Sequence, residues 1–194
     1  MIKRESKEPN SKILDHNNSV EIVKLIQYSK TREKGFKLLM QSYKEALYWM
    51  IRRMVLHHDD AEDVLQCSFM KIWQNLDKFR GDANIYTWVY RIAVNEALAF
   101  LNKKKKQSLS LNEKGEYLSQ QLESDSYFDG DDAQKQLQLA LKTLPSQQRV
   151  VFNLRYFEEM KYQDMAKVLD KSEGGLKANY HHAVKKIEEY FKKN

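Results

Sequence analysis

The chain has 194 residues, of which 42% are hydrophobic, with only six Gly and two Pro. This composition favours a folded, helix-rich chain over a disordered one or a many-turned β protein. A single cysteine, Cys67, excludes a disulfide framework and a thiolate-rich zinc site, and makes a reducing cytoplasm the expected compartment. No signal peptide precedes the first helix, and no run approaches the roughly 18 apolar residues of a membrane span. We therefore expect a soluble cytoplasmic protein without direct membrane insertion.

The net charge of +6 is unevenly distributed along the chain. Residues 1–106 carry a net +7, residues 107–132 a net −6 and residues 133–194 a net +5. Two basic blocks around an acidic one favour two modules that face polyanions and are joined by a tether. Ordinary lysine-rich surfaces would give the same distribution, so charge alone leaves the partner open.

Apolar residues at helical spacing run through most of residues 1–106. Residue types suited to N-caps precede two of the predicted helices, and Gly81 breaks the chain before the last. Four helices with short connections make a compact bundle. The first predicted helix starts at Asn18 or Ser19, and the second covers residues 33–56. The third starts after caps at Asp59 and Asp60, and the fourth covers residues 85–104.

Residues 107–132 have weak periodicity and many Ser, Asp and Glu, which predicts a flexible, self-repelling acidic linker. A short helix near residues 117–122 is the alternative. The chain after the linker is helical again. It ends in a short helix at 162–169, a Gly-containing turn at 170–175 and a long basic helix to about residue 191, which is the helix-turn-helix pattern.

The outward face of that last helix carries candidate DNA readers. The N-terminal part of the second helix enters the major groove in this motif. There Asn can pair with adenine, Lys with guanine or phosphate, and Ala can contact a thymine methyl group. A helical hairpin with a solvated lysine face is the alternative. The candidate readers are Lys177, Ala178, Asn179, His181, His182 and Lys185.

A second candidate face lies on the predicted helix 85–104. With Trp88 as origin of a helical wheel, Arg91 and Asn95 fall within about 60° of it, and the apolar positions fall elsewhere. Aromatic, cationic and amide groups together suit single-stranded or melted DNA. An edge-of-core Trp88 beside an ordinary surface charge is the alternative. The inward positions are Val89, Ile92, Ala93 and Phe100.

The third candidate face lies on the helix after Asp59. An acidic start and an exposed aromatic on a rigid helix favour a protein-docking surface. Capping explains the clustered carboxylates, and no His, Ser or Lys is placed to complete a mechanism, so no catalytic residue is expected. Adjacent histidines on a helix diverge by about 100°, so no metal or other cofactor is expected either. The candidate docking residues are Asp60, Asp63, Gln66, Lys71 and Trp73.

Together and in this order, the three segments resemble the extracytoplasmic-function sigma factors, a minimal branch of the sigma-70 family. The resemblance spans residues 20–104 and 133–191 and rests on DAEDVLQ with Trp73, FRGD…TWVYRIAVN, LP…R.VF.LRYFEE..Y.DMA and SEGGLK. It implies an all-α fold: a four-helix N-terminal bundle (1–106) and a C-terminal helix-turn-helix domain (133–194), joined by the flexible acidic linker 107–132. It also implies a non-enzymatic factor that binds core RNA polymerase and directs promoter recognition and strand opening.

The resemblance further implies a role for each candidate face. The docking residues would bind polymerase, the last helix would read the −35 element, and an anti-sigma factor is an expected partner. Relatives often carry an acid in place of Cys67, and Arg in place of Asn179, His182 and Val184, which implies fewer phosphate contacts here. The expected −10 contacts are Phe79, Arg80, Gly81, Asp82, Trp88, Arg91 and Asn95.

Two other functions are weighed against this one. A conventional helix-turn-helix regulator would bind an operator without docking to polymerase. A nucleic-acid enzyme such as a nuclease would need spaced metal-binding carboxylates, which the sequence lacks.

Overall fold

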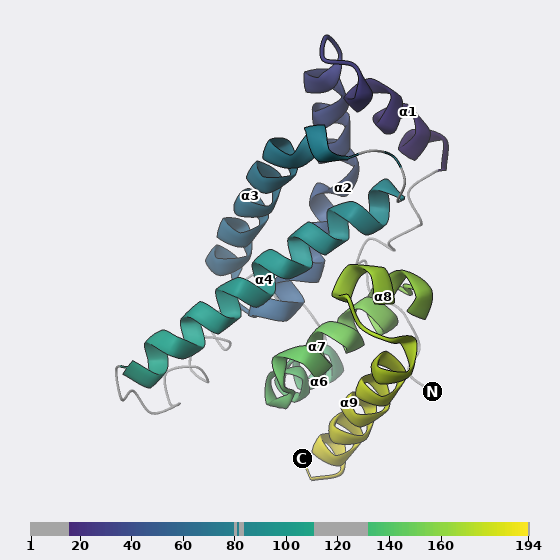
Figure 1. The fold of residues 1–194 in the computed structure, drawn as a ribbon. Coiled ribbons are helices and arrows are strands. Elements are labelled where there is room, and N and C mark those ends of the chain that lie inside the picture. The colour runs from purple at the N-terminus through teal and green to yellow at the C-terminus, as the bar shows by residue number, and fades with distance from the viewer. Residues whose placement is uncertain (1–15, 80, 82–83, 111–131, 194) are drawn as a thin grey trace.

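The computed structural model describes residues 16–79, 81, 84–110 and 132–193. All regular structure in these residues is helical, which confirms the all-α prediction. Two groups of helices are visible in Figure 1: α1–α4, here called the N-terminal region, and α6–α9, the C-terminal region. The helices are α1 (His16–Gln27), α2 (Arg32–Val55), α3 (His58–Asn75), a 3-10 turn (Leu76–Lys78), α4 (Ile85–Ser110), α6 (Asp132–Thr143), α7 (Ser146–Phe152), a π-helical turn (Asn153–Phe157), α8 (Tyr162–Leu169) and α9 (Glu173–Lys193).

The N-terminal region is a four-helix bundle with an apolar interior. The apolar stripe that the sequence predicts for the third helix is buried, because its residues recur every three or four positions and so share one face: Leu65, Phe69, Ile72 and Leu76. Helix α4 lies along α3 and α2, and presents small and β-branched side chains to them. The core includes Leu39, Tyr43, Leu47, Met50, Leu65, Phe69, Ile72, Leu76, Val89 and Ala93.

The structure corrects three predicted helix ends. Helix α3 begins at His58 with His57 at the N-cap, so Asp59 and Asp60 lie in the first turn and do not cap it. Their negative charges still interact favourably with the positive end of the helix dipole. Helix α1 begins at His16, two residues before the earlier predicted start. Helix α4 continues to Ser110, beyond both its predicted end and the first residues of the predicted linker.

Gly35 allows α1 and α2 to approach closely. A Cβ atom at this position would lie 2.9 Å from Cβ of Leu25 and 3.0 Å from the backbone nitrogen of Ile26. Both distances are shorter than ordinary van der Waals contact. The absence of a side chain at this point of α2 therefore determines how α1 seats on the bundle.

The C-terminal region has a small apolar cluster of its own. The predicted first helix of the motif, residues 162–169, matches α8. The predicted turn is too long, because α9 already begins at Glu173 and includes Gly174 and Gly175. Residues 111–131 lie outside the described residues, and they include most of the predicted linker and the alternative helix at 117–122. The cluster comprises Ala140, Leu141, Leu144, Phe152, Ala183 and Ile187.

The two regions pack against each other through α4 and α8, which lie side by side in Figure 1. The π-helical turn also contacts α2. Apolar residues of α7 and α8, among them Val150, Leu154 and Met165, belong to the same buried cluster as the N-terminal core. None of the helices in the described residues is both long and apolar enough for a transmembrane span.

Candidate nucleic-acid and polymerase interfaces

The predicted division of faces on α4 is confirmed in part, because two of the predicted inward residues, Ile92 and Phe100, are only half-buried. Arg91 and Asn95 are exposed and Trp88 is half-buried, so the three form an outward stripe. On the opposite arc Val89 and Ala93 are completely buried. The stripe follows from spacings of three and four residues on a straight helix. It offers an aromatic edge, a guanidinium and an amide on one rigid surface.

Phe79 is not exposed beside this stripe. Only 7% of the residue is accessible, and its ring lies against Trp88 with centroids 5.1 Å apart and planes at 49°. Gly81 follows with a φ of 84°, a left-handed conformation in which glycine avoids the strain of a side chain. This turn leads the chain from the 3-10 turn back to α4. Arg80 and Asp82 lie outside the described residues.

The predicted reading face of α9 is largely exposed. Lys177 and His181 are open to solvent, and the Lys177 ammonium lies 5.6 Å from the ring centroid of Tyr162. Asn179 is half-buried and donates from Nδ2 to the carbonyl oxygen of Gly175 at 2.8 Å, which leaves Oδ1 as the free side of its amide. The remaining members of the face, all exposed, are Ala178, His182 and Lys185.

The inward side of the helix-turn-helix differs from the prediction in detail. The sequence pattern predicts an inward side made of Met165, Ala166 and Leu169 on the first helix and of Leu176, Tyr180, Val184 and Ile187 on the second. Met165, Leu176 and Ile187 are buried, whereas the other four are only half-buried. Val168 and Ala183, which the sequence analysis did not select, are fully enclosed. Both follow a chosen position by three residues, so helical spacing alone would have identified them.

The candidate docking face of α3 is exposed over most of its length. Asp63 and Gln66 are open to solvent. Trp73 is 44% exposed, and its ring lies against that of Phe36 with the ring centroids 5.0 Å apart. The sequence analysis missed Met70, which is 55% exposed and lies on the same side of the helix. Met70 follows Gln66 by four residues and precedes Trp73 by three, so helical spacing alone would have placed it on this side of the helix.

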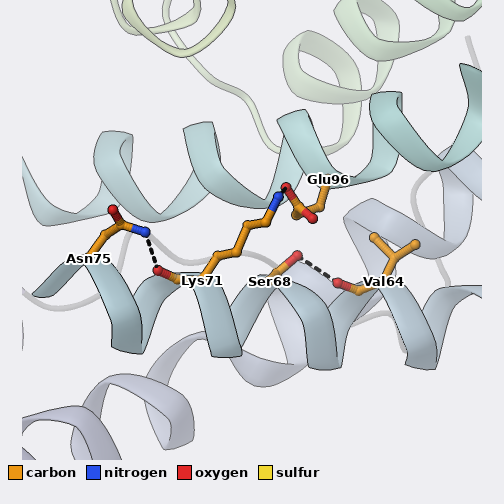
Figure 2. Close-up of polar contacts among 5 residues, drawn as sticks. All are labelled: Val64, Ser68, Lys71, Asn75 and Glu96. Carbon is orange, nitrogen blue, oxygen red and sulfur yellow. Dashed lines mark hydrogen bonds and ion pairs between the residues drawn. The ribbon is translucent and has the colours of Figure 1, made fainter.

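Two candidate docking residues of α3 pair with α4. Figure 2 shows the Lys71 side chain reaching across to Glu96, with Nζ and Oε1 2.5 Å apart. Nearer the start of α3, Asp60 pairs with Lys104 at 2.6 Å. Glu96, which helical spacing places on the inward arc of α4, is therefore the partner of Lys71. These two ion pairs connect the docking helix to the helix that carries the outward stripe.

Polar groups of α3 are also used along its own axis. Ser68 is buried and donates to the carbonyl oxygen of Val64, and Asn75 donates from Nδ2 to that of Lys71 (Figure 2). Because the hydroxyl of the buried serine is paired within its own helix, no unpaired hydroxyl faces α4. Among the described residues, no three His, Cys, Asp or Glu side chains gather in a way that would hold a metal ion.

Two family models match this chain. The one described as "Sigma-70 region 2" matches residues 39–107, and the one described as "Sigma-70, region 4" matches residues 134–187. The chain is also 32% identical over 143 residues to RNA polymerase sigma factor SigV of Bacillus subtilis, covering 74% of this chain and 82% of the relative. The chain belongs to the sigma-70 family, in its extracytoplasmic-function group. As a sigma factor it directs RNA polymerase to promoters for transcription initiation and is not itself catalytic.

Other relatives agree with this assignment. The sigma factor is 27% identical over 165 residues to the ECF RNA polymerase sigma-E factor of Escherichia coli, which covers 80% of this chain and 86% of the relative. Its fold is similar to that of RpoE in a complex with the anti-sigma factor NepR from Bartonella quintana, with a TM-score of 0.66, 23% identity and coverage of 82% and 98%. It is also similar to CnrH bound to the cytosolic domain of CnrY, with a TM-score of 0.68, 19% identity and coverage of 91% and 99%.

Proposed function

We propose that three exposed faces of this sigma factor divide the work of initiation. The face of α3 docks on core RNA polymerase, the stripe of α4 holds the melted −10 strand, and α9 reads the −35 duplex. The observation that carries the proposal is that each candidate face is accessible on a different helix of a sigma-70 family chain.

The −10 contact depends on capture of an unstacked base. Extruding a base costs a few kcal/mol, and stacking on an aromatic side chain returns about 1–3 kcal/mol per base. Trp88 supplies the accessible aromatic edge, Arg91 a phosphate contact and Asn95 a hydrogen bond to a base edge. Phe79 supports Trp88, and stacks on a flipped base only when its ring leaves that contact. Arg80, Gly81 and Asp82 complete the loop that receives the base.

The −35 contact is made in the major groove by the first half of α9. Asn179 presents Oδ1, an acceptor that suits the amino group of adenine or cytosine. Lys177 and Lys185 bind phosphates, and Ala178, His181 and His182 contact bases or sugars. Few long cations face the groove, so this module alone holds DNA weakly.

Docking on polymerase makes the two weak DNA contacts effective. An apolar centre at Met70 and Trp73 with polar neighbours at Asp63 and Gln66 has the composition of a protein interface. Asp60 and Lys71 contribute charge at its edge. Once polymerase positions both regions, the second DNA contact forms at an effective concentration of roughly millimolar. We place this chain in the cytoplasm, where polymerase acts.

An anti-sigma factor is a further proposed partner. Two of the similar structures, those of RpoE and CnrH, are complexes, the first with the anti-sigma factor NepR and the second with the cytosolic domain of CnrY. We infer that a comparable protein binds this chain and withholds it from polymerase.

Copurification with core polymerase tests the docking role. We expect Asp63→Ala combined with Trp73→Ala to abolish copurification. The matched control, Glu21→Ala combined with Tyr28→Ala, removes an exposed acid and a 70% exposed aromatic from α1 and its end and leaves binding intact. Retention of core binding by the first double variant contradicts the docking assignment. A wild-type chain that binds DNA but never core polymerase would instead be a helix-turn-helix regulator.

Transcription from matched and pre-melted templates tests the −10 role. We expect Trp88→Ala and Asn95→Ala to reduce initiation on duplex promoters, and a template with an unpaired −10 segment to restore much of it for the variants. The control Lys192→Ala removes an exposed cation at the end of α9, and we expect this variant to initiate as well as the parent chain on each template. Unchanged initiation by both α4 variants on duplex DNA contradicts the role.

A further inference from the structure

The reading face of α9 carries two histidines side by side. His181 and His182 are both exposed, and their ring centroids lie 6.0 Å apart. Within the described part of the chain, neither imidazole makes a hydrogen bond or an ion pair. Each ring is therefore available to a ligand that approaches this face from solvent.

Helical geometry places the two rings on opposite flanks of the exposed side of α9. Leu176, Ala183 and Ile187 are the buried residues of this helix and mark its inward side. Successive residues turn by about 100°, so His181 and His182 each lie about 50° from the direction that points away from the core, one on either side of it. A helix that enters the major groove in this orientation turns one imidazole toward each wall of the groove.

The walls of the groove are the sugar–phosphate backbones of the two strands. An α-helix with its side chains is about 10–12 Å across, and the major groove is about 12 Å wide. Side chains on the flanks of a helix in the groove therefore reach the backbones, whereas those at the centre of the exposed side face the base edges. His181 and His182 hold the flanks, and Ala178 holds the centre.

The neighbours of both histidines one turn away on α9 include exposed cations. His181 lies four residues from Lys177 and four from Lys185. His182 lies three residues from Lys185 and four from Lys186. Like charges at this spacing repel one another, and a phosphate that approaches the face offsets that repulsion. The surroundings of the two rings therefore attract phosphate whatever the charge of the rings themselves.

No carboxylate pairs with either histidine among the described residues. Asp164 of α8 lies 3.9 Å from Lys167 of the same helix, and α7 has no acid. Helix α6 has one acid, Asp132, at its first residue, and this end of α6 reaches Tyr190 near the end of α9 through Gln136. The acids of α9 itself lie at least six residues from either ring, or about 9 Å along the axis: Glu173, Glu188 and Glu189.

The elements packed against the start of α9 add positive charge on the Lys177 side. The ring centroid of Tyr162, at the start of α8, lies 5.6 Å from Nζ of Lys177. The guanidinium carbon of Arg155, in the π-helical turn, lies 5.2 Å from the same centroid. The two histidines are thus titratable groups within a face whose other charged members are cations.

Protonation of an imidazole on this face changes how strongly the face binds DNA. Histidine in its ordinary state changes charge between about pH 5 and about pH 8. The imidazolium form donates from both ring nitrogens, and its hydrogen bonds to phosphate oxygens are charge-assisted. Each phosphate that a protein cation neutralises also releases counterions and strengthens binding. Because the protonated form binds better, affinity increases as the pH falls through this range and is lost as it rises.

We propose that α9 binds the −35 duplex together with protons, which His181 and His182 take up as they meet the phosphates of the two strands. The affinity for the duplex then increases as the pH falls from about 8 to about 6. This inference rests on the proposed function of α9 and adds to it a dependence of promoter binding on pH.

The affinity of the full chain for duplex DNA tests the proposal directly. The probe is a fluorescently labelled duplex of mixed sequence, about 20 base pairs long and at low salt, because the contacts concerned are to phosphates. We expect the parent chain to bind about tenfold more tightly at about pH 6 than at about pH 8, by fluorescence anisotropy. The slope of log affinity against log salt concentration becomes steeper by about 2 at the lower pH, since two more phosphates are neutralised.

Matched variants assign the pH response to the two histidines. His181→Gln combined with His182→Gln cannot gain protons at these positions, and binds at about pH 6 only as tightly as the parent chain does at about pH 8. His181→Lys combined with His182→Lys is charged at both pH values and binds tightly at both. The control His57→Gln removes a half-buried histidine at the N-cap of α3, where its side chain makes no capping hydrogen bond, and keeps the full response.

The outcomes distinguish this inference from the proposed function. No response in the parent chain, or an undiminished response in the double glutamine variant, overturns the coupling to protons. Lys177→Ala combined with Lys185→Ala tests the contact itself. If this variant weakens duplex binding at about pH 8 while the parent chain shows no response, the −35 role stands and the coupling fails. If neither this variant nor the histidine variants change binding at either pH, the −35 role of α9 and the coupling both fail.

Discussion

Helix α4 packs on two sides, and the two interfaces differ in chemistry. Toward α2 and α3 it buries side chains such as Val89 and Ala93 without any accessible surface. Toward the C-terminal region it presents Tyr90, whose hydroxyl bonds to the buried carboxylate of Glu158. An apolar interface loses its entire stabilisation when it opens, whereas charged groups regain hydration. The first interface therefore maintains the fold through apolar burial, whereas the second depends in part on a buried, hydrogen-bonded carboxylate.

The largest expected effect comes from the apolar interface. Ile72 on α3 is completely buried, and Ile72→Ala removes its packing and leaves a cavity, so we expect a loss of about 2–5 kcal/mol in the free energy of unfolding. All three tryptophans, at 49, 73 and 88, lie in the N-terminal region, so denaturation followed by tryptophan fluorescence reports this region selectively.

Met70→Ala on the same helix is the control for this truncation. Met70 is 55% exposed, so its loss changes the unfolding free energy by less than about 0.5 kcal/mol. Equal losses in the two variants would show that α3 does not contribute its predicted stripe to the core.

Gly35→Ala tests how closely the apolar interface between α1 and α2 is packed. Alanine favours a helix over glycine by about 1 kcal/mol, but its Cβ atom would meet Leu25 and the backbone of Ile26 within about 3 Å. Overpacking typically costs about 1–3 kcal/mol, so we expect a net destabilisation of up to about 2 kcal/mol by tryptophan fluorescence. At Gly174 a Cβ atom would meet nothing within 4 Å, and Gly174→Ala should stabilise the C-terminal region by about 0.5–1 kcal/mol. Stabilisation by both changes contradicts the close approach.

Arg149→Met examines the polar interface from its other end. The variant loses donors to the carbonyl oxygens of Leu141 and Lys142 in the last turn of α6, to that of Leu144 just after it, and to that of Met54. We expect a loss of about 2 kcal/mol, seen as faster amide hydrogen exchange in α6 and α7 with little change in α3. Gln147→Met, at an exposed position of α7, is the matched control and leaves exchange unchanged. Equal acceleration in α3 would mean that the two regions unfold as one unit.

The difference between the interfaces also explains what could be predicted from the sequence. Periodic apolar residues predicted α2, α3, α8 and the outward face of α4, because an apolar residue at every third or fourth position determines which side of a helix is buried. The pairing of Arg53 with Glu158 could not be predicted, because it joins residues 105 positions apart across two regions. Neither residue interrupts a local pattern. The same holds for Phe79, whose burial depends on a contact with Trp88 that helical spacing cannot show.

The smallest expected effect on stability concerns the pair of Lys71 and Glu96. The Lys71 side chain is 53% exposed and that of Glu96 15%, and such pairs contribute about 0–1 kcal/mol. We expect Lys71→Met and Glu96→Gln each to change the unfolding free energy by less than about 1 kcal/mol, and the difference from the parent chain to shrink at high salt.

Affinity for core polymerase shows which role the Lys71 charge has. If Lys71 contacts polymerase, Lys71→Met weakens core binding, whereas Glu96→Gln leaves the lysine free and preserves or increases affinity. If the pair instead serves to seat α3 on α4, both variants weaken binding equally, since each breaks the same ion pair. Our assignment of Lys71 to the docking face requires the first pattern. Equal weakening would remove Lys71 from that face and assign it, with Glu96, to the interface that maintains the fold.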